Sequence, residues 1–206
     1  MSGFRSFAIV PAAGRCRRMG ASKLLLPMRG ATLIDAVLRA WIESAVTQTV
    51  VVVRAADVAL AERCRRHDVH VVAVDAEPRE MRDSLEIGLQ YAARRFAPQV
   101  DDAWLVAPAD LPGLNAKSIN AVLARYEPAA PRVVIPLGDG RPGHPVLLPW
   151  SEAAAFRSMR GAGGLDCFLR DRPAGKTDAF EPVDGVVRGD LDTPDDLRRW
   201  TSDATG

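Results

Sequence analysis

Short, wholly apolar runs alternate along the chain with longer segments whose apolar residues recur at helical spacing. The apolar runs, which indicate buried strands, lie at residues 7–10, 50–53, 69–74, 103–107, 133–136 and 146–148. The helical segments lie at residues 32–45, 57–66, 82–96 and 115–126. Thr32 and Asn115 are the expected N-caps, and Asp57 stands near the start of the second helical segment. Strands that alternate with helices are typical of βαβ units, so the pattern predicts an α/β fold whose mainly parallel sheet is covered on both faces.

The alternation stops near residue 136, where the chain enters a loop at residues 138–143. Three glycines and a proline in this loop favour either a functional loop or a crossing to an edge of the sheet. The rest of the C-terminal third shows no regular pattern and is expected to be irregular. Because no repeat and no linker interrupts the sequence, one domain is expected over residues 1–206.

The segment after the first predicted strand has the composition of an anion-binding turn. In an open parallel sheet, ligands bind beyond the carboxyl ends of the strands. The small residues 12–14 let the backbone approach a ligand, and successive N–H groups in such a turn form an anion cradle. Four positive charges follow and suit a polyphosphate; they belong to Arg15, Arg17, Arg18 and Lys23. The glycine spacing excludes a P-loop and the dinucleotide fingerprint, and a solvated basic turn is the alternative.

Charge and composition exclude several classes of protein. Lys and Arg total 27 and Asp and Glu total 26, and the resulting net charge of +1 argues against a nucleic-acid or membrane partner. No apolar run approaches the roughly 20 residues that span a bilayer. The three cysteines are widely spaced and odd in number, which favours the cytoplasm. His67 and His70 are interpreted as part of a solvated turn rather than as metal ligands.

Several segments carry a resemblance to a known family. Ala12-Ala13-Gly14, Arg18-Met19-Gly20 and Lys23-Leu24-Leu25 resemble the signature loop of nucleotidyltransferases that share a GT-A-type, Rossmann-like fold. The resemblance is to the MobA-like NTP transferase family, in particular to its molybdenum cofactor cytidylyltransferase-like branch. Further matches are Met81, Ser84 and Leu85, then Asp110 and Pro112, then Gly143-His144-Pro145, and finally the segment 190–197. The resemblance covers nearly the whole chain and implies a three-layer fold.

The resemblance also implies a set of site residues. The nucleotide-binding residues that it implies are Ala12, Ala13, Gly14, Arg18, Lys23 and Ser84. In the family this loop wraps the triphosphate of the incoming NTP, and its Arg and Lys, here Arg18 and Lys23, neutralise phosphate charge. Catalysis is accordingly expected from Arg18, Lys23 and Asp110.

Three carboxylates are the candidate metal ligands. Asp110 follows an apolar run, where a carboxylate either holds Mg²⁺ beside phosphate oxygens or caps a helix, and its spacing leaves both interpretations open. The resemblance favours the metal, because the matching family aspartate coordinates Mg²⁺. Asp190 and Asp192 are candidates for a second ligand, since alternation in an extended segment puts them on one side of the chain. The alternative is that Asp192 begins the last helix.

The activity implied by the resemblance is Mg²⁺-dependent nucleotidyl transfer. A phosphorylated acceptor such as molybdopterin attacks the α-phosphorus of an NTP, and pyrophosphate leaves. CTP is favoured over GTP, because Ala13 stands where the guanylyltransferase branch has glycine. Ala162 and Asp166 depart from the family, which has an aspartate and an arginine at these positions of its cofactor-side segment.

Two other functions stay open. One is a cytidylyltransferase for an isoprenoid-precursor or sugar phosphate, because the first loop of such enzymes has a sequence similar to the first loop of this chain. The other is a catalytically silent nucleotide-binding protein in cofactor handling, which the departures at Ala162 and Asp166 would suit.

Overall fold

The computed structural model describes residues 3–14, 23–28, 30–75, 78, 80–159, 164–170, 172–173 and 175–182. Its strands are β1 (Ser6–Pro11), β2 (Pro27–Met28), β3 (Ala31–Thr32), β4 (Gln48–Arg54), β5 (His70–Val74), β6 (Ala103–Val106), β7 (Val133–Gly138), β8 (Arg141–Pro142), β9 (Val146–Pro149) and β10 (Thr177–Phe180). Its α-helices are α1 (Leu33–Ile42), α2 (Val58–Cys64), α3 (Met81–Phe96), α4 (Ala116–Leu123), α5 (Ala153–Ser158) and α6 (Leu165–Arg170). Short 3₁₀ turns lie at Lys23–Leu25 and Trp150–Glu152.

The strands form a mixed, mainly parallel sheet in the order β10-β7-β9-β6-β1-β4-β5, with β8 paired to β7. β1 is parallel to both of its neighbours, β4 and β6, and β5 continues in the same direction. β9 runs antiparallel to β6 and to β7, so β7 and its parallel neighbour β10 point the same way as β1. The predicted α/β, Rossmann-like fold with a mainly parallel sheet is confirmed.

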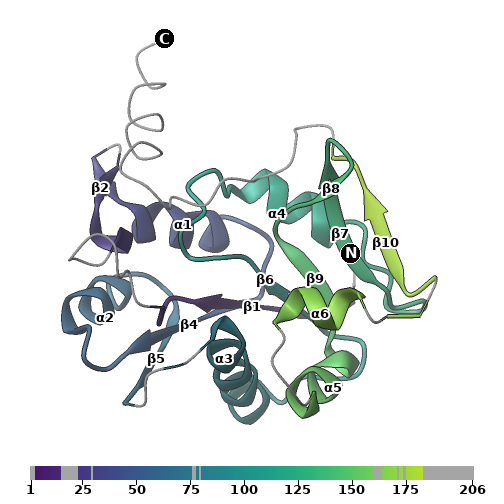
Figure 1. The fold of residues 1–206 in the computed structure, drawn as a ribbon, viewed down its shortest axis with the longest axis horizontal. Coiled ribbons are helices and arrows are strands. Elements are labelled where there is room, and N and C mark those ends of the chain that lie inside the picture. Colours follow the sequence, from purple (N-terminus) through teal and green to yellow (C-terminus); the bar gives the residue numbers. More distant parts are fainter. Residues whose placement is uncertain are drawn as a thin grey trace.

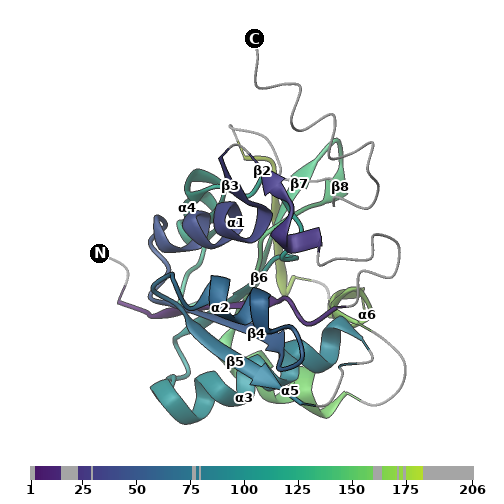
Figure 2. The same cartoon turned by 90° about the vertical axis from the view of Figure 1, so that its left-hand side faces the viewer.

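Helices cover both faces of this sheet, which gives the three expected layers (Figures 1 and 2). One buried apolar cluster joins α1, α2 and α4 to one face, and a second joins α3, α5 and α6 to the other. The β1 side chains alternate between the clusters, Ala8 and Val10 facing the first and Ile9 the second. α3 approaches the sheet closely at Gly88, where an added Cβ would overlap Cγ2 of Ile9 and lie 3.3 Å from Cγ2 of Val52.

The helix starts follow local capping chemistry, as predicted. Thr32 caps α1 and forms a reciprocal capping box with Asp35, while Asp57 caps α2 by accepting from the Leu60 N–H. Asn115 caps α4 by accepting from the N–H of Ser118. These side chains satisfy N–H groups that the first turn of a helix leaves without partners.

The C-terminal third departs from the expectation of an irregular segment, because it contains α5, α6 and β10. The loop predicted at residues 138–143 is a tight β7–β8 hairpin whose central residues, Asp139 and Gly140, have φ values of 49° and 70°. The predicted single domain over residues 1–206 includes residues 183–206, which lie outside the described part, and it stays a prediction.

A buried carboxylate connects α1 to α2. Asp35 is only 2% exposed and accepts hydrogen bonds from the Thr32 N–H and hydroxyl at 2.8 and 2.7 Å. Arg63 donates to it through Nε at 2.8 Å, and Nε2 of His67 lies 2.8 Å from its Oδ1. Burial acts to raise the pKa of Asp35, but hydrogen bonds from Arg63, Thr32 and His67 outweigh it and hold the pKa well below its ordinary value.

The interpretation of His67 and His70 as part of a solvated turn is correct for the turn that leads into β5 and wrong for the solvation of the two rings. His67 packs against Asp35, as described above, and its side chain is 14% exposed. His70 begins β5, where its Nε2 lies 2.8 Å from Oε1 of Gln48 and its Nδ1 lies 3.2 Å from the hydroxyl of Tyr91. Both rings hold neighbouring elements together.

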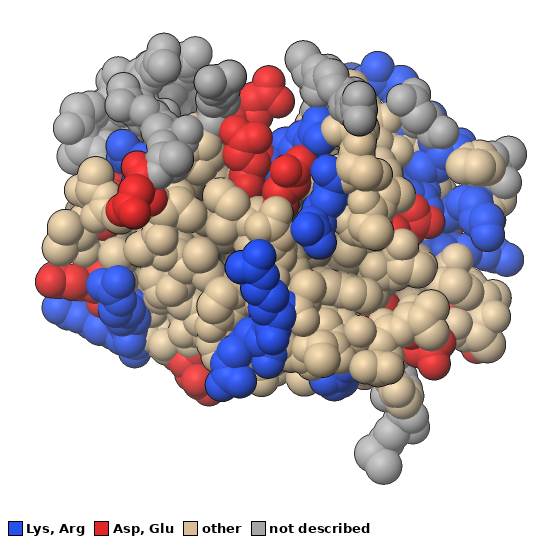
Figure 3. Space-filling model, turned by 90° about the horizontal axis from the view of Figure 1, so that it is seen from below, with Lys and Arg blue, Asp and Glu red and all other residues tan. Residues whose placement is uncertain are grey.

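The charged side chains are mixed in sign on the face that carries α3 and α5 (Figure 3). Lys and Arg side chains alternate there with Asp and Glu and with uncharged surface, so this face offers no continuous basic patch. In the part of the chain that the structure describes, no helix is long and apolar enough to cross a bilayer.

Candidate active site

The chain leaves β1 through small residues, as the anion-binding turn requires. The N–H of Ala12 donates to the Val52 carbonyl at 2.8 Å and so extends the contact between β1 and β4. Ala12 and Ala13 are buried, and Gly14 is exposed. Among the described residues no atom lies within 4 Å of a Cβ added at Gly14, whose backbone does not adopt the left-handed conformation that the sequence allowed. Arg18 lies outside the described residues.

Lys23 and Asp110 meet at the carboxyl edge of the sheet. Nζ of Lys23 forms an ion pair with Oδ2 of Asp110, and each side chain is 19% exposed. Lys23 opens the 3₁₀ turn that resumes the chain after the first loop, and the buried Leu24 anchors that turn. Asp110 follows β6 through residues 107–109, which are all buried. Two residues 87 positions apart in the sequence thus come together because β1 and β6 are parallel neighbours.

The fold excludes a helix-capping role for Asp110. The next helix, α4, begins at Ala116, and its N-cap is Asn115. The carboxylate of Asp110 points instead to the edge where Lys23 stands. The structure thus rules out the capping alternative, and the role of Asp110 as a metal ligand stays a prediction.

Asp110 has the chemistry of a magnesium ligand. Its oxygens are hard donors, and Mg²⁺ is usually held by one or two carboxylates together with substrate phosphates and water. Among the described residues no group of three or more His, Cys, Asp or Glu side chains gathers into a metal site. A metal at Asp110 would therefore take its other ligands from the substrate, from water or from the segment that contains Asp190 and Asp192, both of which lie outside the described residues.

The first turn of α3 lies at the same edge. Ser84 is 2% exposed and faces the sheet, one helical turn before the close approach at Gly88. Met81, the first residue of α3, is 50% exposed. Ser84 is therefore buried beside the site rather than displayed on it, and its predicted contact with the nucleotide stays a prediction.

One further cation lies at this edge of the sheet, at residues 54–57, a strand end that the sequence indicates without assigning a role to any of its side chains. Arg54 ends β4, the strand on the other side of β1 from β6, and its side chain is 25% exposed. Its Nη2 lies 3.7 Å from Oδ2 of Asp57, the N-cap of α2. Arg54 directly follows a run of four valines, so the sequence itself places it at the carboxyl end of a strand, as it does Ala12 and Asp110.

His144 brings the Gly-His-Pro segment to the site. The first residue of β9, Val146, is paired with Val106, the last residue of β6, so the segment lies beside the one leading to Asp110. The His144–Pro145 peptide is cis, and Nδ1 of the ring is buried and has no hydrogen-bond partner among the described residues. Burial lowers the pKa of His144, and Asp166, the Val106 backbone and Asp110 act in the opposite direction. The imidazole is accordingly neutral at physiological pH.

Asp166 is one of the two departures from the family motif, because the family has an arginine at this position. Asp166 stands in the first turn of α6, exposed to solvent and close enough to His144 to influence its pKa. A carboxylate, not a guanidinium, therefore faces this side of the site. Ala162, the other departure, lies outside the described residues.

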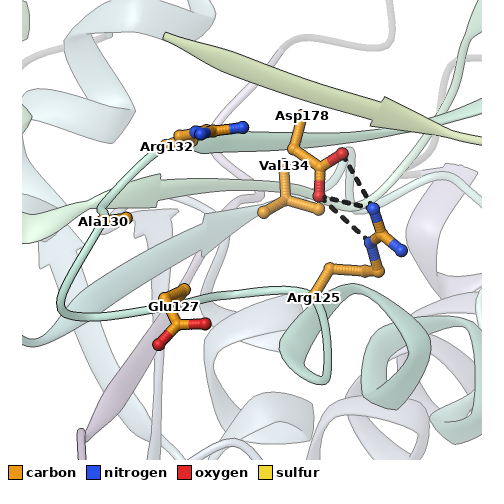
Figure 4. Close-up of a pocket in the computed structure, with 6 residues that line it drawn as sticks. All are labelled: Arg125, Glu127, Ala130, Arg132, Val134 and Asp178. Carbon is orange, nitrogen blue, oxygen red and sulfur yellow. Dashed lines mark hydrogen bonds and ion pairs between the residues drawn. The ribbon is translucent and has the colours of Figure 1, made fainter. Parts of the chain in front are cut away.

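A hollow at the opposite edge of the sheet contains none of the predicted residues (Figure 4). It is lined by Arg125, Glu127, Ala130, Arg132, Val134 and Asp178. Nε and Nη2 of Arg125 each donate to a different carboxylate oxygen of Asp178 at 3.0 Å. β7 and β10 begin here, whereas the candidate site lies where β1, β4 and β6 end.

Comparison with known proteins places these features in a family. The model of the MobA-like NTP transferase domain matches residues 8–177. The 2-C-methyl-D-erythritol 4-phosphate cytidylyltransferase of Streptomyces avermitilis is 31% identical in an alignment 186 positions long that covers 80% of this chain and 71% of that protein. Nicotine blue oxidoreductase of Paenarthrobacter nicotinovorans is 26% identical in an alignment 204 positions long that covers 93% of this chain and 94% of that protein.

A solved structure extends the likeness to three dimensions. The Mycobacterium tuberculosis protein Rv0371c, solved in complex with manganese, has a TM-score of 0.75 and 23% identity, and the match covers 97% of this chain and 98% of that one. At this identity the likeness shows the fold. The domain match and the cytidylyltransferase relative go further: the chain belongs to the MobA-like NTP transferase family.

Proposed function

We propose that this protein transfers a nucleotidyl group, with CMP favoured, from an NTP to a phosphorylated acceptor and releases pyrophosphate. The observation that carries the proposal is the pairing of Lys23 with Asp110 at the carboxyl edge of the sheet, the same edge at which the chain leaves β1 through Ala12, Ala13 and Gly14. A cation for phosphate oxygens and a carboxylate for a divalent ion are the two groups that this reaction needs at one place.

Each described residue of the site has a separate proposed role that follows from its charge and position. Gly14 leaves room for the triphosphate, and Lys23 neutralises the phosphate charge that would otherwise repel an anionic acceptor. Asp110 would hold Mg²⁺ or Mn²⁺, which when bound screens the phosphate oxygens and stabilises the leaving pyrophosphate. Arg18, Asp190 and Asp192 are proposed to complete the site on the strength of the family motif.

The family alone does not determine the reaction, because one relative is named an oxidoreductase and another a cytidylyltransferase. The pairing of a lysine with a carboxylate at the end of β6 supports nucleotidyl transfer, since it provides electrostatic stabilisation of phosphates and no group specific to redox chemistry. CTP is proposed as the donor from Ala13 and from the cytidylyltransferase relative.

The acceptor is proposed to be a small phosphorylated molecule. Molybdopterin follows from the branch that the motifs resemble, and 2-C-methyl-D-erythritol 4-phosphate follows from the relative in Streptomyces. Asp166 favours the second of these, because a carboxylate close to His144 would repel a phosphate held where the molybdopterin branch has an arginine.

A pyrophosphate-release screen tests the proposal. CTP, GTP, ATP and UTP are each incubated with either acceptor in the presence of Mg²⁺, Mn²⁺ or EDTA. We expect release with CTP and one acceptor, which EDTA abolishes. Asp110→Asn should reduce the rate at least about 100-fold, as expected for loss of an electrostatic group at the reacting phosphates.

Asp178→Asn is the matched control, because it removes a carboxylate that pairs with a cation at the opposite edge of the sheet and should leave the rate unchanged. Wild-type turnover by the Asp110→Asn variant would reject the proposed role of that residue. Thermal stabilisation by CTP without pyrophosphate release from any pair would instead identify a silent nucleotide-binding protein.

A further inference from the structure

Two oppositely charged groups of the proposed site, Lys23 and Asp110, form an ion pair with each other. Each side chain of the pair is only 19% exposed, so solvent screens the pair less than it screens a surface pair. The cation proposed to bind phosphate is thus held by the carboxylate proposed to bind metal. Arg54, at the neighbouring strand end, pairs with a different carboxylate, Asp57.

We propose that the Lys23–Asp110 ion pair is a closed state of the site that opens only when nucleotide and divalent metal bind together. This inference rests on the proposed function and concerns how its two ligands are admitted. A metal ion alone must draw Asp110 away from Lys23 and leave the ammonium group beside a second cation. A nucleotide alone must draw Lys23 away and leave the carboxylate beside a phosphate.

Joint binding removes both penalties, because the two ligands bring the charges that the separated side chains need. Asp110 exchanges an ammonium partner for a divalent ion, and Lys23 exchanges a carboxylate partner for a phosphate. The ion pair has to be broken only once when both ligands bind. Binding of one ligand therefore makes binding of the other more favourable, which is a positive coupling between the ligands. The ion pair would also keep the site from filling with free metal or free nucleotide.

The coupling has an unusual consequence that can be measured without turnover. Removal of the lysine should improve binding of metal alone, because Asp110 no longer has a competing partner. Lys23→Met should bind Mn²⁺ in the absence of nucleotide about three- to tenfold more tightly than the wild-type protein, as followed by the loss of the free Mn²⁺ signal in electron paramagnetic resonance. Lys23→Gln serves as a second variant if the Met variant fails to fold.

Arg54→Met is the matched control for the general effect of removing a positive charge from this edge of the sheet. It should improve binding of Mn²⁺ less than twofold, since its cation does not contact Asp110. Asp110→Asn combined with Lys23→Met should lose the improvement, because the carboxylate that gains from release of the lysine is then absent.

The reciprocal measurement uses CTP in EDTA. Asp110→Asn removes the charged partner of Lys23 in this ion pair and should bind CTP without metal about three- to tenfold more tightly than the wild-type protein, as measured by isothermal titration calorimetry. Equal binding of Mn²⁺ by the wild-type protein and both Lys23 variants, or an equal gain in Arg54→Met, would overturn the closed-state proposal. Neither result depends on pyrophosphate release, so failure of this inference is distinguishable from failure of the proposed function.

Discussion

Replacement of Asp35 by asparagine should destabilise the protein more than loss of any exposed ion pair. The change keeps the shape of the side chain but removes its charge and replaces one acceptor oxygen with an amide donor. In the wild-type protein both carboxylate oxygens accept hydrogen bonds from donors on Thr32, Arg63 and His67. An asparagine at this site would turn its amide group toward one of these donors.

The magnitude follows from burial and from the number of partners lost. A hydrogen bond to a charged group contributes about 1.5–3 kcal/mol, and the carboxylate is 2% exposed, so the loss is close to the full value. Arg63 is 32% exposed and regains water when its partner is lost, which keeps the total below that of a fully buried pair. We expect a loss of about 2–4 kcal/mol, which for a protein of 206 residues lowers Tm by about 4–16 °C.

The assay is thermal unfolding by circular dichroism between pH 3 and pH 7. The folded-state pKa of Asp35 lies below its unfolded value of about 3.9, so its contribution is fully present above about pH 4 and is lost as the pH falls toward the folded-state pKa. The Tm of the wild-type protein should therefore fall more steeply between pH 4 and pH 3 than that of Asp35→Asn, so that the difference between the two narrows toward pH 3.

Asp178→Asn is the control, because Asp178 forms a two-point ion pair with an arginine whose side chain is 50% exposed. Solvent screens that pair, and its removal should leave Tm almost unchanged. A Tm for Asp35→Asn within 2 °C of wild type, or parallel acid profiles for the two proteins, would refute the reasoning about this carboxylate.

Three further predictions concern the core, a helix cap and the thiols. Gly88→Ala should destabilise the protein by about 1–2 kcal/mol in urea unfolding, because the overlap with β1 outweighs the roughly 1 kcal/mol by which alanine favours a helix; a stabilised variant would contradict the close packing of α3. Asn115→Ala should cost about 1 kcal/mol through loss of the cap of α4, and an unchanged urea midpoint would show that the cap contributes nothing. Burial raises the pKa of Cys64 to about 12, so iodoacetamide at pH 8 should label the half-buried Cys167 before Cys64, as read by peptide mass spectrometry; prior labelling of Cys64 would contradict its burial.

The sequence predicted those parts of the fold that local chemistry determines. Apolar runs located β1, β4, β5, β6, β7 and β9, and short polar side chains located the starts of α1 and α4. β10 escaped prediction because Thr177–Phe180 has little apolar character, and its place beside β7 depends on the tertiary fold. The three-residue apolar run at residues 146–148 predicted a strand but carried no sign of its antiparallel direction.

The proximity of Lys23 and Asp110 was predictable from the expected topology of the sheet and not from the secondary-structure propensities of the residues. Both were placed at the carboxyl ends of parallel strands, and such ends share one edge of the sheet whatever their distance in the sequence. The environment of His67 was not predictable, because its partner Asp35 belongs to another helix and the turn around it looks polar. The roles of Arg18, Asp190 and Asp192 stay predictions.

The position of β9 has a consequence for the order in which the polypeptide assembles during synthesis. β7 emerges from the ribosome before β9, yet among the described strands only β9 connects β7 to the central part of the sheet. β7 therefore has no place to dock until about ten further residues have been made, and β6 presents an open edge meanwhile. A nascent chain that stalls within this interval would expose two unpaired strand edges, one on β6 and one on β7.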